Sequence, residues 1–449
     1  MLTDFLDVVA AHPEVELHSL LLLQDGQVLA EGYADPYLPT DRALVYSVSK
    51  TFTATAVGLA VHEGRFALED RVVDLLPADV PEPLDDRIAE VTVHHLLSMS
   101  TGRDVDTFAE MVRRPAPQWA RTWLSMRPAG PVGSRHVYDN GCSWLLGEIV
   151  RRSTGESLVD YLRPRLLEPL GIEIGWETDD LGRELGLTGV HVTTAHLSRL
   201  GELYRCDGVH EGVRLLPEGW VDRLSTAHIP TTDDKADWTR GYGYQVWQSR
   251  HGYRLDGAYG QFVLVLPEQR AVLTLTSQQE NSQVLLDAVW EHVLPALVPG
   301  VQDDPAELAA RLEALVVPGP GRPVAADQFA APPVTAVAVR PRDGAADGSA
   351  GTGWTLTLSS DGRDVEIDAD PTGWTRTELT VDGRVVPVAA VVSGGVETGR
   401  LEVALAFPTT PHVAELSLEL DADGRGSTDR CAWRTAPLER SRLVDLHMW

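Results

Sequence analysis

A serine and a lysine stand three positions apart at the start of an apolar segment, residues 46–61, and could together activate a nucleophile. The segment carries apolar side chains at helical spacing, and Gly64 suits the left-handed residue that ends a helix. If Ser47 lies in the first turn of this helix, Lys50 is one turn further on and faces the same way. The positive end of the helix dipole favours an oxyanion and disfavours an ammonium, so it eases proton transfer from Ser47 to Lys50.

The use of basic residues singles out Lys50. Lys50 and Lys235 are the only lysines, whereas the chain has 36 arginines. An arginine cannot give up its proton near neutral pH but a buried lysine can, so a lysine here is suited to act as a general base. The alternative interpretation is that the Ser-x-x-Lys spacing arises by chance and that Lys50 is a solvated helix residue.

Length, charge and cysteine content limit the class of protein. A chain of 449 residues predicts about two or three domains, and a formal net charge of −28 disfavours nucleic acid, membranes and polyanionic substrates as partners. Residues 1–7 lack the features of a secretory signal and no apolar run of about 18 residues is present, which predicts a cytoplasmic protein. Cys142, Cys206 and Cys431 have no metal-binding or redox spacing, so we expect reduced cysteines and no metal or cofactor.

Residues 1–300 have the pattern of an α+β domain. The predicted elements, in order, are a helix at residues 2–11, strands at 17–23 and 27–32, a helical region at 46–227, strands at 242–247, 262–266 and 271–277, and a helix at 283–297. Asp25-Gly26 between the first two strands predicts a hairpin with a type I′ turn. The simplest arrangement is one antiparallel sheet built from both ends of this region and flanked by helices, with the helical insert beside it.

The pattern changes beyond residue 300. Residues 301–323 combine a short helix with a Pro/Gly-rich linker, and residues 324–449 alternate apolar and polar side chains between Asp-Gly turns. This predicts an all-β accessory domain, a barrel or a sandwich. Covering the cleft, self-association into a homo-oligomer and added stability all remain open as its role.

Two further stretches could complete a site around Ser47 and Lys50. In Tyr138-Asp139-Asn140, the phenol could carry protons and the Asn140 amide could bind Lys50 and a substrate carbonyl. In Asp256-Gly257-Ala258, the Ala258 amide could join the Ser47 amide in an oxyanion hole, because a glycine beside an edge-like strand lets a substrate approach the backbone. The alternatives are a half-buried tyrosine with an ordinary helix cap, and a plain β-turn.

Together these motifs resemble those of the serine β-lactamase and penicillin-binding-protein-like superfamily, in its class C-like branch of esterases, D-aminopeptidases and amide hydrolases. Ser47-x-x-Lys50 matches the first motif of the family, Tyr138-x-Asn140 matches the second, and residues 93–102 and 215–220 resemble supporting phrases. The resemblance covers about residues 15–297 and implies the β-lactamase/transpeptidase-like fold. It also implies roles for the motif residues: Ser47 as nucleophile, Lys50 as base, Tyr138 as acid/base partner, Asn140 as a positioning residue, and Gly257 and Ala258 in the oxyanion strand.

The third motif departs from the family pattern. Leu255 stands where the family usually has a cation, and Asp139 and Asp256 add negative charge near the expected site. This disfavours an anionic β-lactam and favours a metal-free serine hydrolase acting on a small ester, a neutral amide or a substrate with a free amine. Whether the activity is that of an esterase or of an amidase remains open. The alternative is a catalytically weak binding or regulatory protein of the same fold.

Overall fold

The computed structural model describes residues 1–298, 300, 303–324, 336–342, 353–360, 363–381 and 384–438. Within these residues the chain divides into two compact units. One comprises residues 1–20, 30–44 and the described residues from Thr276 onward, and the other comprises residues 21–29 and 45–275. The domain bounds expected from the sequence, residues 1–300 and 324–449 with a linker between, stay a prediction.

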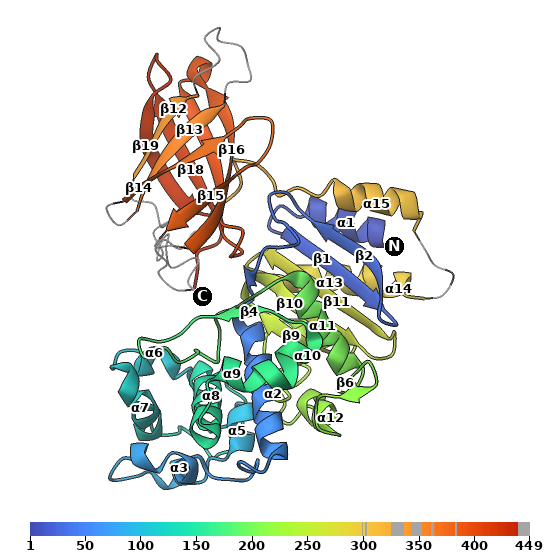
Figure 1. The fold of residues 1–449 in the computed structure, drawn as a ribbon, viewed down its shortest axis with the longest axis vertical. Coiled ribbons are helices and arrows are strands. Elements are labelled where there is room, and N and C mark those ends of the chain that lie inside the picture. The colour runs from blue at the N-terminus through green and yellow to red at the C-terminus, as the bar shows by residue number, and fades with distance from the viewer. Residues whose placement is uncertain are drawn as a thin grey trace. The chain divides into compact units, whose positions relative to one another are not determined.

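An antiparallel sheet of six strands forms in the N-terminal two thirds of the chain (Figure 1). In spatial order its strands are β2 (Gln27–Tyr33), β1 (Glu16–Gln24), β11 (Ala271–Gln278), β10 (Gln261–Leu266), β9 (Tyr253–Gly257) and β8 (Trp247–Gln248). Asp25 and Gly26 both have positive φ, 51° and 75°, which confirms the type I′ turn between β1 and β2. The prediction of one antiparallel sheet made from both ends of this region is also confirmed.

Two strand predictions need correction. The strand expected at residues 242–247 is reduced to β8, because Gly241 and Gln245 have positive φ and break the extended backbone. The strand at residues 262–266, expected at an edge, lies between β11 and β9. The strand β9 was not predicted, because Arg254 and Asp256 disguise its fully buried apolar face.

Helices fill the insert between the strands. They are α2 (Ser49–His62), α3 (Val72–Leu75), α4 (Asp86–Ala89), α5 (Val93–Leu97), α6 (Phe108–Met111), α7 (Trp119–Ser125), α8 (Asn140–Thr154), α9 (Leu158–Leu162), α10 (Glu168–Leu170), α11 (Thr194–Arg205) and α12 (Trp220–Ser225). Short strand pairs join them: β4 (Ile174–Trp176) with β5 (Val190–Val192), and β6 (Val209–His210) with β7 (Val213–Arg214). The helix α2 is buried on nearly every side, because Gly58 lets the indole of Trp220 pack against its backbone.

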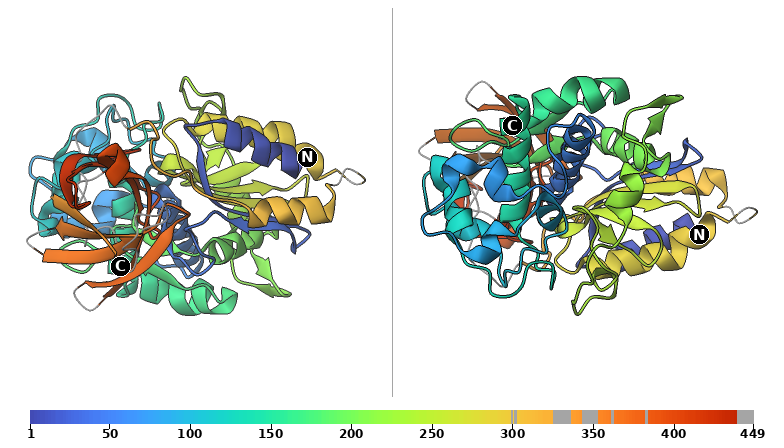
Figure 2. Two further views of the ribbon diagram at one scale, coloured as in Figure 1. Left: turned by 90° about the horizontal axis from the view of Figure 1, so that it is seen from above. Right: turned by 90° about the horizontal axis from the view of Figure 1, so that it is seen from below.

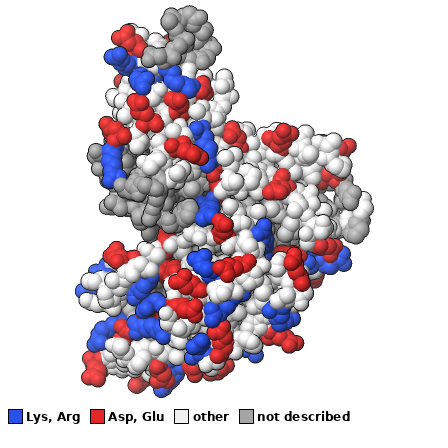
Figure 3. Space-filling view, viewed as in Figure 1, with Lys and Arg blue, Asp and Glu red and all other residues white. Residues whose placement is uncertain are grey.

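The unit that contains residues 1–20, 30–44 and the described residues from Thr276 onward includes several helices and a second sheet. Its helices are α1 (Leu2–Ala11), α13 (Ser282–Ala288), α14 (Leu294–Ala296) and α15 (Pro305–Glu313), and Figure 2 shows α1 and α15 side by side. A two-residue strand, β3 (Ala43–Leu44), lies outside the six-stranded sheet. No described helix is both long enough and apolar enough to span a bilayer. On the face drawn in Figure 3, described acidic and basic side chains are interspersed.

The C-terminal sheet is antiparallel and has eight strands, which confirms the all-β domain that the alternating pattern predicts (Figure 1). In spatial order they are β14 (Arg363–Ala369), β13 (Trp354–Ser360), β12 (Ala336–Pro341), β19 (Gly426–Trp433), β18 (Val413–Leu420), β17 (Arg400–Ala406), β16 (Arg384–Gly395) and β15 (Thr375–Val381). A bridge from Asp370, just after β14, to Val391 on β16 brings the two ends of the sheet together into a near-barrel. Inward-facing side chains such as Trp354, Leu356 and Leu416 form its core.

A buried ion cluster connects the first strand with the C-terminal sheet inside this unit. Arg434 donates hydrogen bonds to Glu16 Oε1 at 2.8 Å, to Glu415 Oε1 at 2.7 Å and to the carbonyls of Pro318 and Gly319. Both Arg434 and Glu16 are almost fully buried. Burial raises the pKa of Glu16, and the Arg434 guanidinium opposes that shift.

Replacing Arg434 by methionine is expected to destabilise the protein. The buried Glu16 and Glu415 carboxylates would lose their hydrogen-bonded cation, with Arg322 left 3.8 Å from Glu16, and the loss costs about 3 to 5 kcal/mol of the free energy of unfolding at pH 7. Urea titration followed by circular dichroism measures the loss. The control is Arg400→Met, which breaks the half-exposed pair with Glu402 and should cost less than about 1 kcal/mol. Equal losses in the two variants would contradict a structural role for the buried cluster.

Candidate active site

Ser47 and Lys50 meet at the start of the buried helix α2. Ser47 lies in a single turn of 3₁₀ helix, Tyr46–Val48, directly before α2, and Lys50 lies in the first turn of α2. The Lys50 Nζ and the Ser47 Oγ are 2.8 Å apart, so the two groups are hydrogen-bonded. Ser47 is partly exposed between buried neighbours, whereas Lys50 is 1 % exposed. A hydroxyl open to a substrate therefore has a buried amine directly beside it.

The surroundings of Lys50 favour its uncharged form. Burial lowers the pKa of Lys50 to about 7, against the opposing fields of the Asp106, Asp256 and Asp139 carboxylates. At neutral pH a large fraction of the molecules thus carries a free amine that can accept a proton. A second hydrogen bond joins Nζ to the backbone carbonyl of Leu187 at 2.8 Å.

Tyr138 stands over the same amine. The Lys50 Nζ lies 4.9 Å from the centre of the Tyr138 ring, and that ring stacks on Trp247 with centroids 5.9 Å apart. Burial raises the pKa of Tyr138 above its usual range, and a hydrogen bond with Ser47 acts in the opposite direction. The phenol is therefore protonated at neutral pH. It can donate a proton or relay one, while Lys50 is the group able to act as base.

The backbone of Gly257-Ala258 runs close to the nucleophile segment. A Cβ at position 257 would overlap the carbonyl oxygen of Val45, so only glycine allows this approach. Two tyrosines with positive φ lie next to the Ser47 and Ala258 backbone amides, the candidates for an oxyanion hole. Tyr46, φ 46°, precedes Ser47, and Tyr259, φ 64°, follows Ala258. Their rings pack edge to face with centroids 5.3 Å apart, which holds the two segments against each other.

The side chains of Asn140 and Asp139 have local partners. Asn140 donates from its side-chain Nδ2 to Asp106 at 2.6 Å and from its backbone N–H to the same carboxylate at 3.0 Å. Asp139 caps α8 by accepting from the Gly141 N–H, and it also accepts from the hydroxyl and N–H of Thr107. Asp139 thus has the capping role that the sequence left open, and its charge still acts on Lys50. Asp106 is the exposed carboxylate of this group.

A buried arginine accompanies the third motif. Arg254 and Asp256 lie on the same face of β9, and the Arg254 Nε donates to the Asp256 carboxylate at 2.7 Å. The Arg254 side chain is completely buried, and its guanidinium lies 4.4 Å from the ring of Trp238. Leu255 points into the apolar core. A cation is therefore present one position before the expected one, where Asp256 neutralises it.

Sequence reasoning did not identify three groups at this site: the Leu187 carbonyl, Asp106 and Arg254. A backbone carbonyl in a loop leaves no pattern in a sequence. Asp106 belongs to no motif, and it precedes Asn140 by 34 positions, so no local pattern could have identified it as the partner of Asn140. Arg254 sits two residues before Asp256, and the period of a strand could have paired them.

Comparison with known proteins gives the family of the chain. Residues 8–297 match the family model described as Beta-lactamase. The chain is 29% identical over 222 residues to 6-aminohexanoate-dimer hydrolase of Paenarthrobacter ureafaciens, covering 46% of this chain and 56% of that protein. It is 28% identical over 305 residues to penicillin-binding protein 4 of Amycolatopsis lactamdurans, covering 58% of this chain and 79% of that one.

A solved structure shows the same fold over nearly the whole chain. The octameric penicillin-binding protein homologue from Pyrococcus abyssi matches 90% of this chain and 97% of its own, with a TM-score of 0.52 and 16% sequence identity. Self-association and a cytoplasmic location stay predictions for this chain. The family match spans more than half of the chain and includes both Ser47-x-x-Lys50 and Tyr138-x-Asn140. The chain therefore belongs to the Beta-lactamase family, whose fold the structure confirms.

Proposed function

We propose that the protein is a serine hydrolase that is acylated on Ser47 by a small ester or amide. The observation that carries the proposal is the 2.8 Å contact between the Ser47 hydroxyl and an amine whose pKa is lowered to about 7. The similarity to 6-aminohexanoate-dimer hydrolase supports this class of activity. No metal-binding arrangement of three or more His, Cys, Asp or Glu side chains occurs among the described residues.

The proposed reaction has two halves, acylation of Ser47 and hydrolysis of the acyl-enzyme, and Lys50 and Tyr138 move protons in both. The Ser47 Oγ attacks the carbonyl carbon while its proton passes to the neutral Lys50 Nζ. The backbone N–H groups of Ser47 and Ala258 stabilise the oxyanion of the tetrahedral intermediate. Lys50 then returns the proton through the Tyr138 phenol to the leaving alkoxide or amine, and the acyl-enzyme remains. Water repeats the attack with Lys50 and Tyr138 as base and acid, which releases the carboxylic acid and restores Ser47.

Covalent labelling tests the proposal. A fluorophosphonate probe should add one adduct per chain by intact mass, and peptide mapping should place it on Ser47. The variant Ser47→Ala is the control and should take no label and hydrolyse no p-nitrophenyl acetate. A folded wild-type protein that takes no label would instead support the alternative of a catalytically weak binding or regulatory protein, which Leu255 in the third motif favours.

The negative charge near the site indicates which substrates should be preferred. Asp106 is exposed, and its field acts on both Lys50 and Tyr138, whereas Asp256 is paired with Arg254. We therefore expect substrates with a free amine to be preferred over the same substrates with the amine blocked. Comparing hydrolysis of amino-acid amides before and after N-acetylation measures this preference. Asp106→Asn should reduce this preference about fivefold, as expected for a contribution of about 1 kcal/mol from one exposed charge. An unchanged preference would exclude Asp106 from substrate selection.

The activity should depend on pH through Lys50. The proposed base must be uncharged, and burial lowers the pKa of Lys50 to about 7, so kcat/KM should rise with pH and reach half its plateau near pH 7. Tyr138 stays protonated across this range, because burial raises its pKa. Initial rates with a neutral ester between pH 5 and 9 measure the profile. A profile that is flat between these limits would contradict the assignment of Lys50 as base.

A further inference from the structure

The loop between β4 and β5 makes a row of polar contacts with the nucleophile helix α2. We call residues 183–190, which are the second half of this loop and the first residue of β5, the carbonyl segment. The Gly186 carbonyl accepts a hydrogen bond from Thr53 Oγ1 at 2.7 Å, and the Leu187 carbonyl accepts one from Lys50 Nζ at 2.8 Å. The Val190 N–H donates to the Ser49 hydroxyl at 3.0 Å. Three residues of the carbonyl segment are therefore hydrogen-bonded to side chains in the first turns of α2.

The Leu187 contact decides how the Lys50 amine is oriented. A neutral amine has two N–H groups and one lone pair, and a carbonyl oxygen can only accept. When one N–H points at Leu187, the lone pair is free to face the Ser47 hydroxyl 2.8 Å away. The charged or titratable groups that also act on Lys50 are the carboxylates of Asp106, Asp139 and Asp256, with the phenol of Tyr138 over the amine.

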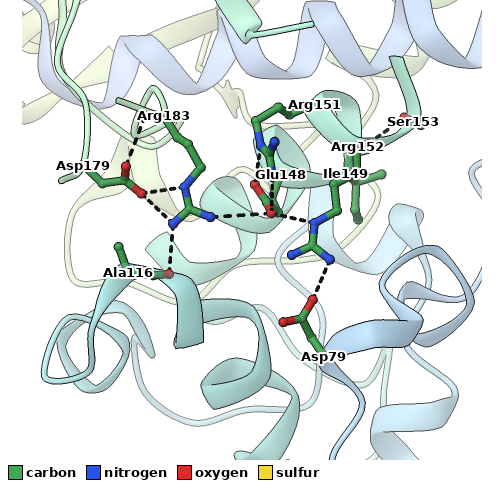
Figure 4. A network of polar contacts seen from close by, with 9 residues as sticks. All are labelled: Asp79, Ala116, Glu148, Ile149, Arg151, Arg152, Ser153, Asp179 and Arg183. Carbon is green, nitrogen blue, oxygen red and sulfur yellow. Dashed lines mark hydrogen bonds and ion pairs between the residues drawn. The ribbon is translucent and has the colours of Figure 1, made fainter. Parts of the chain in front are cut away.

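Arg183 fixes the start of the carbonyl segment (Figure 4). Its Nε donates to Asp179 Oδ2 at 2.8 Å, and its Nη2 donates to the Ala116 carbonyl at 2.9 Å. Its Nη1 lies 3.5 Å from Glu148 Oε1, and the guanidinium is 5.0 Å from the ring of Trp144. One side chain thus joins the loop to two other parts of the same unit, the segment of Ala116 and the helix α8.

Glu148 is the buried centre of this network. Its side chain is 2 % exposed, and it accepts hydrogen bonds from Arg151 and Arg152 as well as pairing with Arg183. Burial acts to raise the pKa of Glu148, but the hydrogen bonds from Arg151 and Arg152 hold that pKa below its usual value. Glu148 belongs to α8, the helix that starts two residues after Tyr138. The network therefore connects the segment that carries the Leu187 carbonyl, the hydrogen-bond acceptor of Lys50, to α8, the helix that follows Tyr138.

We propose that Arg183 is a positioning residue, which holds the Leu187 carbonyl against Lys50 so that the amine lone pair faces Ser47. The role in catalysis rests on the proposed function, whereas the effect on the Lys50 amine does not. When the Arg183 side chain is lost, the carbonyl segment loses its contacts with Glu148 and the Ala116 carbonyl and is joined to Asp179 only by backbone hydrogen bonds of residue 183. Water then reaches the buried amine, and its pKa rises toward that of a solvated lysine.

The test compares two arginines that share Glu148. Arg183→Gln removes the arginine that holds the carbonyl segment. Arg151→Gln removes one whose hydrogen bonds go to Glu148 and which reaches the segment only through its field at Glu184. We expect Arg183→Gln to lower kcat about 10- to 100-fold with little change in KM, and to move the half-plateau of kcat/KM upward by about half a pH unit or more. Arg151→Gln should leave kcat within about twofold of the wild-type value and should not move the half-plateau of kcat/KM. Equal effects of the two variants, or a fall in kcat with an unchanged pH profile, would overturn the proposal.

A direct measurement separates this inference from the proposed function. The chain has only two lysines, so ¹³C NMR of protein labelled at lysine Cε gives the pKa of Lys50 without any turnover. The Lys50 pKa should be higher in Arg183→Gln than in the wild type and unchanged in Arg151→Gln. If the wild-type protein neither labels nor hydrolyses but the Lys50 pKa shifts as expected, the proposed function fails and the positioning role stands. An unshifted Lys50 pKa in Arg183→Gln removes the positioning role, whatever the activity.

A second pair of variants guards against misfolding of Arg183→Gln. Thr53→Val removes the hydroxyl that holds the Gly186 carbonyl, and Thr53→Ser keeps it. Thr53→Val should move the Lys50 pKa upward, as Arg183→Gln does, whereas Thr53→Ser should match the wild type. A Thr53→Val variant with an unchanged Lys50 pKa would show that the carbonyl segment does not set the state of the amine.

Discussion

Replacing Lys50 by arginine should lower kcat/KM for a neutral ester by about a thousandfold or more, although the positive charge is retained. A guanidinium keeps its proton at any pH the protein survives, so it cannot accept the proton of the Ser47 hydroxyl. The side chain is also too large for a site where Lys50 is 1 % exposed and bonded to the Leu187 carbonyl. Steady-state kinetics at pH 8 measures the loss.

The chain supplies its own control for this variant. Lys235 is the other lysine, and it lies over the ring of Trp238 outside the Ser47 contact. Lys235→Arg should retain activity within about twofold, and both variants should have circular dichroism spectra like the wild type. Activity in Lys50→Arg above a tenth of the wild-type value would mean that another group accepts the proton from Ser47.

Gly257→Ala should lower kcat by about 100- to 1000-fold, the usual effect of losing an oxyanion donor. The added Cβ would overlap the Val45 carbonyl oxygen and press on the side chain of Gln261, so the backbone of β9 must move away from the nucleophile segment. The following amide, that of Ala258, moves with it. KM should change less than kcat, because the contact that is lost forms fully only in the transition state.

A matched glycine variant separates this effect from general destabilisation. A Cβ on Gly130 would meet no atom closer than 3.7 Å, so Gly130→Ala should leave kcat and thermal stability near those of the wild type. Fluorophosphonate labelling of Gly257→Ala should slow in parallel with kcat. Labelling at the wild-type rate would show that the Ala258 amide does not contribute to the oxyanion hole.

Local patterns predicted a large part of the fold. Apolar spacing gave the helix that carries Lys50, Asp25-Gly26 gave the type I′ hairpin, and alternation gave the all-β class of the C-terminal region but not its eight strands. The strand expected at residues 242–247 was wrong, because Gln245, with positive φ, interrupts it and Gly241, also with positive φ, precedes it. A sequence window does not show where the backbone must turn to meet a distant segment.

What the sequence determined by itself is the pair at the centre of the site, because Ser47 and Lys50 are one helical turn apart and need only local structure to meet. Only the tertiary structure decided the surroundings of that pair. The Leu187 carbonyl lies 137 positions from Lys50, Asp106 takes the amide of Asn140 from 34 positions away, and Arg434 reaches Glu16 across 418. Such contacts depend on how helices and sheets pack, and burial then sets the pKa of Lys50, so no spacing in the sequence encodes them.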